Sequence, residues 1–423
     1  MPAAPAVTSA EIAKLINSAR VLVIAGERLN GELLRRFYAG RGFQPIWTTR
    51  QAEANSLLSA VLRAGDHGLA AELFHANALR NTATLPPLHR ELLLSDAFLT
   101  YADALARGAM PVEYRTEDEA LTPEPVDVAA VLDAAIGSPD PAAAIEALAP
   151  TTPTYRALRQ ALQSYRSGAP VGDKAKTTRL REIEVNLERQ RWLPRRLPAE
   201  RVWVNAADAK LVMYRADRPV FSTRVIVGQD GKPNQTPEFE VAIDGILLNP
   251  PWNVPESITS QEILPKISRD PDYLKRHNMV LQPNGGLQQQ PGHGTALGYI
   301  KFEMENRFDV YLHDTPSKNL FSRDNRRISH GCIRVQQPRE LAALLMQQPI
   351  ETINQAIATG STTRRDLPTP VPAFVVYQTA FVDSDGTLQF RPDVYNRDAE
   401  IWQYLHPAQQ PVAEREPSGQ GRS

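Results

Sequence analysis

Apolar residues recur at two different intervals along this chain, and the change of interval divides the chain in two. In residues 27 to 195 they repeat at helical spacing between loops that contain glycine and proline. Examples are Leu33-Leu34 with Phe37-Tyr38, Leu57-Leu58 with Val61-Leu62, and the run from Glu91 to Tyr101. From Arg201 to Val227 apolar and polar residues alternate instead, with turn residues at Ala207-Asp208 and Asp217-Arg218. The pattern predicts an α+β multidomain fold with a helical N-terminal domain and a β-rich second domain.

Three further segments stand out in the second half. Helical spacing returns between Glu256 and Gln290, which predicts a helical insertion, and the alternative is a surface excursion without function. Val371 to Phe390 is typical of a hairpin around Asp383 to Gly386. We therefore expect a flexible segment over residues 1–26, a helical domain over 27–198, a β-rich domain over 199–405 with an insertion at about 256–290, and a disordered tail over 406–423.

Composition excludes several classes of function. The formal net charge is -1 and the isoelectric point is near 6.7, so no electrostatic footprint for nucleic acid exists. The eight histidines show no metal-ligand spacing, and we expect neither a metal nor another cofactor. The apolar run Val21 to Ala25 is far too short for a transmembrane helix. The first residues also lack the basic and apolar regions of a signal peptide.

Candidate chemistry centres on Cys332, the only cysteine of the 423 residues. A lone cysteine is often a small buried apolar residue, but this one lies in Ser329-His330-Gly331-Cys332-Ile333-Arg334. A cysteine nucleophile acts as the thiolate and needs a nearby base. Phe308 to His313 is typical of a strand that ends at His313, and Ile328 to Val335 of a second extended run. Adjacent strands lie about 5 Å apart, which favours His313 as the base.

His330 is two residues from Cys332 on the same run, so its side chain is less well placed to serve as the base. Its backbone N–H and those of Gly331 and Cys332 could instead face a developing oxyanion. Gly331 would allow close approach of the substrate because it has no Cβ.

These motifs resemble the active-site signature of the L,D-transpeptidase catalytic domain, the YkuD-type family of bacterial cell-wall enzymes. The resemblance implies that Cys332 is the nucleophile, His313 is the base, and the backbone carbonyl of Asp314 orients the imidazole. Residues 330 to 332 would form the oxyanion hole, and Arg334 would lie near the substrate. This chain has Asp314 where many members have glycine, but the implied role is a main-chain one. The implied substrate contacts are Arg334, Ser329, Tyr299 and Trp252.

The similarity extends to a branch of that family, the YcbB-like enzymes, which have a scaffold domain before the catalytic domain. Trp252 lies in Asn249-Pro250-Pro251-Trp252, and Tyr299 in Leu297-Gly298-Tyr299, both of which resemble that branch. The insertion at 256–290 is similar to its capping subdomain. A separate peptidoglycan-binding module has no room, because only Arg166 to Arg179 separates two predicted helices. The resemblance implies an exported periplasmic protein of a Gram-negative bacterium, although this sequence shows no signal peptide.

The implied reaction is acyl transfer between peptidoglycan stem peptides, one the donor and one the acceptor. A link from meso-diaminopimelate to meso-diaminopimelate is the expected product. L-alanine to meso-diaminopimelate cross-linking, lipoprotein attachment and L,D-carboxypeptidase activity stay open, as does a non-catalytic cell-wall-binding scaffold. Carbapenem-type β-lactams are the inhibitors that the family implies.

The basic residues near Cys332 have two interpretations. A solvated loop is the usual explanation for such a cluster, and attraction of stem-peptide carboxylates is the functional one. The cluster contains Lys318, Arg323, Arg326, Arg327, Arg334 and Arg339, of which Arg334 is our candidate.

Overall fold

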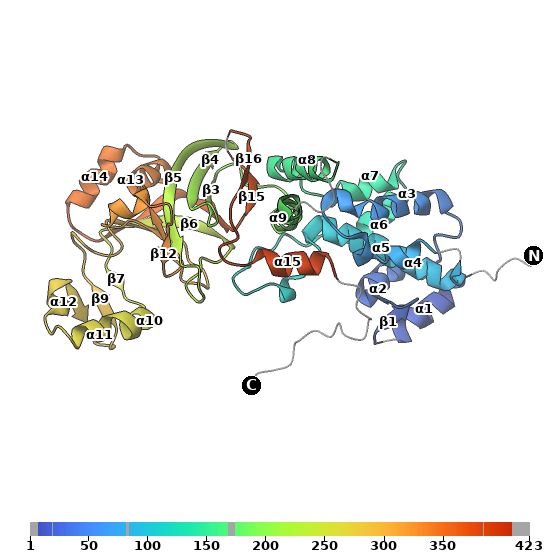
Figure 1. Ribbon diagram of the computed structural model, residues 1–423, viewed down its shortest axis with the longest axis horizontal. Coiled ribbons are helices and arrows are strands. Elements are labelled where there is room, and N and C mark those ends of the chain that lie inside the picture. The colour runs from blue at the N-terminus through green and yellow to red at the C-terminus, as the bar shows by residue number, and fades with distance from the viewer. Residues whose placement is uncertain (1–6, 19, 82–83, 168–173, 384, 408–423) are drawn as a thin grey trace, which may run out of the picture.

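The computed structural model describes residues 7–18, 20–81, 84–167, 174–383 and 385–407. Helices gather at the N-terminal end of the molecule and a large sheet at the other end (Figure 1). The α+β expectation is confirmed. Among the described helices, none combines the length and the apolar character needed to span a lipid bilayer.

The N-terminal part is built around a long buried helix, α5 (Pro87–Arg107). Glu91 of α5 accepts hydrogen bonds from the backbone N–H groups of Ile46 and Trp47 and from the Tyr38 hydroxyl, so its buried charge is satisfied. The helices around α5 are α2 (Gly31–Gly40), α3 (Gln51–Leu62), α4 (Ala76–Leu79), α6 (Val128–Ile136), α7 (Pro141–Glu146), α8 (Pro153–Ser167) and α9 (Lys174–Arg191).

The first 26 residues are more ordered than the sequence predicts. Helix α1 (Ser9–Ser18) buries Ile12 and Ile16 completely, and β1 (Leu22–Ile24) pairs with β2 (Glu27–Leu29). The expectation of a flexible segment over 1–26 is therefore wrong for this stretch, because two residues one helical turn apart anchor α1 in the core. Residues 1–6 and 19 lie outside the described part, as do residues 408–423 of the expected disordered tail.

Nine strands form the sheet of the second part, in the order β12-β5-β13-β11-β10-β6-β14-β3-β4. Strand β5 also pairs with β4, so the sheet closes on itself. Helices α13 (Pro338–Met346) and α14 (Ile350–Ala358) add Leu341, Leu345 and Ile353 to its core. The strands are β3 (Arg201–Asn205), β4 (Lys210–Arg215), β5 (Arg218–Gly228), β6 (Phe239–Leu248), β10 (Ile300–Glu303), β11 (Leu312–His313), β12 (Arg327–Ser329), β13 (Ile333–Val335) and β14 (Thr363–Val376).

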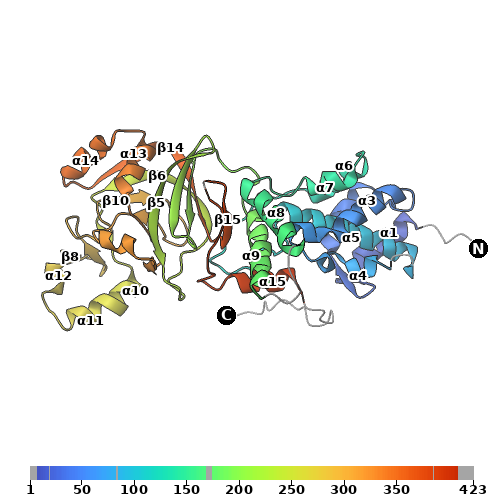
Figure 2. The same ribbon diagram turned by 45° about the horizontal axis from the view of Figure 1, so that its top comes forward.

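The insertion between β6 and β10 forms a small unit with its own core of Val254, Ile263, Met279 and Leu287. It lies at the end of the molecule away from the helical part in both views (Figure 1, Figure 2). The sequence predicts a helical insertion, but this unit also contains a three-stranded sheet. Its elements are β7 (Trp252–Asn253), α10 (Glu256–Ile258), a π-helical turn (Thr259–Ile263), α11 (Leu264–Ile267), α12 (Tyr273–Arg276), β8 (Met279–Leu281) and β9 (Leu287–Gln289).

The last helix returns to the helical part. After the hairpin of β15 (Ala380–Val382) and β16 (Leu388–Phe390), α15 (Asp398–Leu405) packs against α9 (Figure 1). Ile401 and Leu405 belong to the same buried cluster as α5. Asn186 of α9 also exchanges two hydrogen bonds with Thr379, at 2.7 and 3.0 Å. The two parts therefore share a core and a buried polar contact.

This shared core generates a prediction. Ile401→Ala removes a fully buried side chain from the helical cluster, so we expect a loss of about 2–5 kcal/mol in the free energy of unfolding. Denaturant unfolding followed by tryptophan fluorescence measures it. Glu400→Ala, at an exposed position of the same helix, is the matched control and should change stability by less than about 0.5 kcal/mol. Equal effects from both variants would contradict the packing of α15 described here.

Candidate active site

Two short parallel strands bring the predicted nucleophile and base together. Leu312 of β11 pairs with Ile333 of β13, and His313 pairs with Arg334. Leu312 and Ile333 are both buried in the sheet core. Because side chains alternate across a strand, Cys332, His313 and Arg334 share the opposite face. The register sets Cys332 opposite Tyr311 and not directly opposite His313, so the pairing of His313 with Cys332 stays a prediction.

The predicted strand over Phe308 to His313 is largely wrong, because only its last two residues are in β11. Asp309 has a positive φ of 52°, which breaks the extended backbone. Asn306 stabilises this turn, since its side-chain amide donates to the carbonyls of Met304 and Val310 at 2.7 Å. The turn brings the Asp309 carbonyl to 3.6 Å from the Cys332 sulfur.

Tyr311 is a neighbour of Cys332 that sequence reasoning missed. Its backbone N–H and its hydroxyl both act on the sulfur and favour the thiolate. Burial raises the pKa of the Cys332 thiol above its ordinary value, although Tyr311 and the positive charges of Lys301 and Arg334 act in the opposite direction. The signal that could have revealed Tyr311 is its place two residues before His313, on the same face of a strand.

His313 is buried and held in one orientation. Its Nδ1 donates a hydrogen bond of 2.5 Å to the backbone carbonyl of Asp314, which leaves Nε2 without the proton. Burial, together with the charge of Arg334, lowers the pKa of His313 to about 3. His313 is therefore neutral near pH 7 and can accept a proton. The site holds a neutral imidazole and a neutral thiol, and not a preformed ion pair.

The Asp314 side chain has a structural role that the sequence did not indicate. Its carboxylate accepts hydrogen bonds from the backbone N–H groups of Thr315 and Tyr299, at 2.7 and 2.9 Å, and pairs with Lys318 at 2.6 Å. Gly298 lies against it, and a Cβ there would be only 2.4 Å from the Asp314 Cγ. The carboxylate thus fixes the backbone whose carbonyl holds His313.

The loop before Cys332 is closed by Ser329. The Ser329 hydroxyl donates to the Cys332 carbonyl at 2.6 Å and accepts from the Gly331 N–H at 3.2 Å. Ser329 is buried, and both of its hydroxyl contacts lie within this loop. The substrate contact of Ser329 and the place of the Gly331 N–H in the oxyanion hole stay predictions. In the part of the chain that the structure describes, the N–H groups of His330 and Cys332 have no acceptor.

The capping insertion makes two contacts with this site. Glu262 in its π-helical turn pairs with His330 Nε2 at 2.6 Å, and the Trp252 side chain hydrogen-bonds to Tyr311. His330 therefore points toward the insertion, which agrees with its exclusion as the base. Trp252 reaches the site through Tyr311.

Arg334 is a partly buried cation next to the site. Desolvation lowers the pKa of its guanidinium, and the electrostatic interaction with Cys332 acts in the opposite direction. Within the described residues, no carboxylate lies within ion-pairing distance of its guanidinium. Other members of the basic cluster are engaged: Arg327 pairs with Asp230, Lys318 with Asp314, and Arg339 hydrogen-bonds to Asn354. Tyr299, another predicted contact, lies beside Arg339 and His293 and is partly buried.

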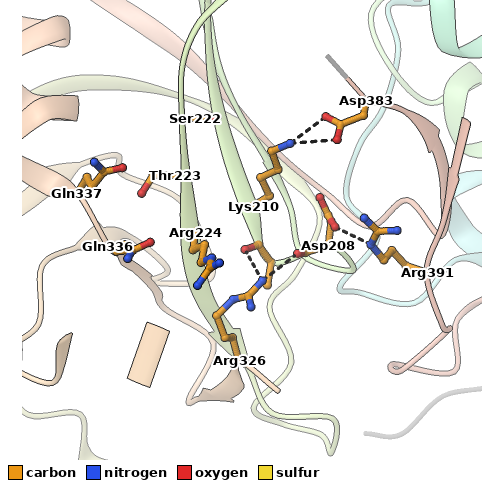
Figure 3. A pocket seen from close by; sticks show the side chains of 11 residues that line it. Asp208, Lys210, Ser222, Thr223, Arg224, Arg326, Gln336, Gln337, Asp383 and Arg391 are labelled. Atoms are coloured by element: carbon orange, nitrogen blue, oxygen red, sulfur yellow. Dashed lines mark hydrogen bonds and ion pairs between the residues drawn. The ribbon is translucent and has the colours of Figure 1, made fainter. Parts of the chain in front are cut away.

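A polar pocket of about 390 Å³ lies where β13 ends. The backbone N–H of Gln336 donates to the Arg224 carbonyl, which joins this pocket to β13 and β5. Figure 3 shows Arg224 and Arg326 close to each other beneath Lys210. Lys210 pairs with Asp383, and Arg326 donates to backbone carbonyls, among them that of Val225. Charged side chains that line the pocket are thus already bonded to other protein groups.

Comparisons with known proteins match both parts of the chain. Residues 32–162 match a scaffold domain, and residues 199–363 match the L,D-transpeptidase catalytic domain of the YkuD type. A Haemophilus influenzae protein named "Putative L,D-transpeptidase" is 29% identical over 399 residues, which cover 87% of this chain and 78% of that protein. A solved structure titled as the Ldtfm-avibactam carbamoyl enzyme is 10% identical, with a TM-score of 0.23 over 42% of this chain and 49% of that chain.

The two domain matches follow the change from helical to β-rich structure along the chain. The histidine and cysteine that the sequence singled out both lie inside the second match. The chain thus combines a segment similar to a scaffold domain with a following segment similar to the L,D-transpeptidase catalytic domain of the YkuD type.

Proposed function

We propose that this L,D-transpeptidase cross-links peptidoglycan stem peptides through an acyl-enzyme on Cys332. The observation that carries the proposal is the neutral His313, whose Nδ1–H is fixed on the Asp314 carbonyl. Its free Nε2 faces the same side of the sheet as the Cys332 thiol. A base and a nucleophile in this arrangement suit acyl transfer.

In the first step His313 takes the proton of the Cys332 thiol as the sulfur attacks the donor carbonyl. The carbonyl is the one after meso-diaminopimelate, and its oxygen becomes an oxyanion. The free N–H groups of His330 and Cys332 are the candidate donors to that oxygen. The intermediate collapses to a thioester, and the proton on His313 passes to the departing amine of D-alanine.

In the second step the side-chain amine of an acceptor stem attacks the thioester. His313 removes a proton from this amine, the new amide bond forms, and Cys332 leaves as the thiol. The cross-link from meso-diaminopimelate to meso-diaminopimelate is the product we propose, with L-alanine to meso-diaminopimelate as the alternative.

The contact of Glu262 with His330 supports transfer over hydrolysis. An insertion held against the nucleophile loop excludes water from the thioester, so an amine can compete for it. We propose that Arg334, which has no carboxylate partner within the described residues, binds a carboxylate of the stem peptide. Trp252 and Tyr299 are the other substrate contacts that we propose. We propose that the enzyme acts in the periplasm of a Gram-negative bacterium, where such a peptidoglycan substrate lies.

The first prediction concerns the nucleophile. Incubation with a carbapenem should add one molecule of the drug to the protein, because the thiolate opens the β-lactam and is acylated. Intact-mass spectrometry measures the adduct, and Cys332→Ala should abolish it. An adduct that persists in Cys332→Ala would contradict the proposed nucleophile.

The second prediction concerns the base. His313→Ala should lower kcat/KM by about 10²–10⁴-fold, the usual contribution of a general base. His330→Ala is the matched control and should cost less, because its side chain faces Glu262.

The pH dependence checks the same assignment. His313 acts as a base only when neutral, and its pKa is about 3, so kcat/KM should hold as the pH falls from about 7 to about 5. An acid limb at the ordinary histidine pKa near 6.5, or equal losses in the two variants, would count against His313.

The third prediction concerns the product. Sacculi treated with the protein, digested to muropeptides and analysed by mass spectrometry should contain dimers linked through two meso-diaminopimelate residues. Dimers linked only through L-alanine would replace the proposed linkage by the alternative. Shortened stems without dimers would instead indicate a carboxypeptidase.

A further inference from the structure

Thr236 is a fully buried residue on the loop that follows β5, and its hydroxyl connects two parts of the catalytic domain. The hydroxyl donates to the carbonyl of Gly331 at 2.8 Å and accepts from the N–H of Gly228 at 2.8 Å. Gly228 ends β5, and Gly331 immediately precedes Cys332. One side chain therefore ties the nucleophile loop to the end of a sheet strand.

The Gly331 carbonyl and the Cys332 N–H belong to the same peptide group. A trans peptide is planar, so its C=O and its N–H point in opposite directions. Because Thr236 holds the carbonyl toward the interior, the Cys332 N–H must point away from it. That N–H has no acceptor among the described residues, whereas the Gly331 N–H is bonded to Ser329.

We propose that Thr236 is a positioning residue, which aims the Cys332 N–H at the oxyanion that forms during acyl transfer. The inference rests on the proposed function, and it names the residue that orients one donor of the oxyanion hole. Gly331 fits this role because its φ of 109° is one that L side chains rarely adopt. The peptide can thus turn its carbonyl inward.

Thr236 is itself held by a second layer of buried contacts. Arg397 donates to the Thr236 carbonyl at 3.1 Å and to the side-chain carbonyl of Gln235 at 3.2 Å. Arg397 also pairs with Glu238 at 3.4 Å. The backbone N–H of Glu238 donates to the carbonyl of Asp118, in the segment before α6, at 2.6 Å. The orientation of the peptide before Cys332 is thus connected to the helical part of the chain.

The test compares two reactions of the only thiol in the protein. Acylation by a carbapenem develops an oxyanion, whereas alkylation by iodoacetamide does not. Thr236→Val keeps the shape of the side chain but loses the hydrogen bond. We expect acylation to slow by about 10- to 100-fold, somewhat less than the loss of a whole oxyanion donor, while alkylation is unchanged. Thr236→Ser keeps the hydroxyl and should restore acylation.

Thr223→Val is the matched control, because it removes a buried threonine hydroxyl that has no partner in the described chain. It should alter neither rate. Acylation of Thr236→Val at the wild-type rate would overturn the inference, and so would a failure of Thr236→Ser to restore it. Equal slowing of both reactions would show that Thr236 acts on the thiol or the fold. Failure of the proposed function is a distinct result, since carbapenem would then still label Cys332→Ala.

Discussion

Closure of the catalytic sheet through β5 is the constraint on which the site depends. The N-terminal part of β5 pairs with β4, and its C-terminal part pairs with β13 and β12. Residues 330 to 332, the turn that ends at Cys332, therefore connect two strands that are both attached to β5. Gly228 ends that strand without a side chain, since a Cβ there would lie only 2.0 Å from the Asn234 carbonyl oxygen. Thr236 can approach β5 for this reason. The turn before Cys332 and the Thr236 side chain that holds it are therefore both attached to β5.

Burial favours the neutral forms of both Cys332 and His313. It raises the pKa of the Cys332 thiol and lowers that of the His313 imidazole. Proton transfer from sulfur to imidazole creates two charges in a desolvated place, and Lys301, Arg334 and the Tyr311 hydroxyl stabilise the thiolate. A thiol that stays neutral at rest is less exposed to oxidation, because the thiolate is the reactive form. This matters for Cys332 because the chain has no second cysteine whose thiol could rescue an oxidised sulfur.

The sequence predicted the elements with strong periodicity and the residues with distinctive chemistry. The helices of the scaffold and the strands from Arg201 to Gly228 follow from local patterns, and so does the pairing of the short runs that end at His313 and begin after Cys332. The roles of Asp314, Tyr311 and Thr236 do not, because each arises from a contact that the fold makes between distant segments. The hydrogen bond by which the Ser329 hydroxyl closes the loop was not foreseen for the same reason. The helix over residues 9–18 was missed because its apolar face is narrow.

Helix α15 lies near the end of the sequence, but in space it belongs to the N-terminal scaffold. Ile401 and Leu405 complete a hydrophobic core whose other members lie mostly before residue 194. Synthesis starts at the N-terminus. This core therefore stays incomplete until nearly all 423 residues have been made. A cut at the apparent boundary near residue 198 would not yield two independent fragments, since one would lack a helix and the other would expose it. The two domains are contiguous in sequence but are joined at both ends of the catalytic domain, which restricts how far one can swing against the other.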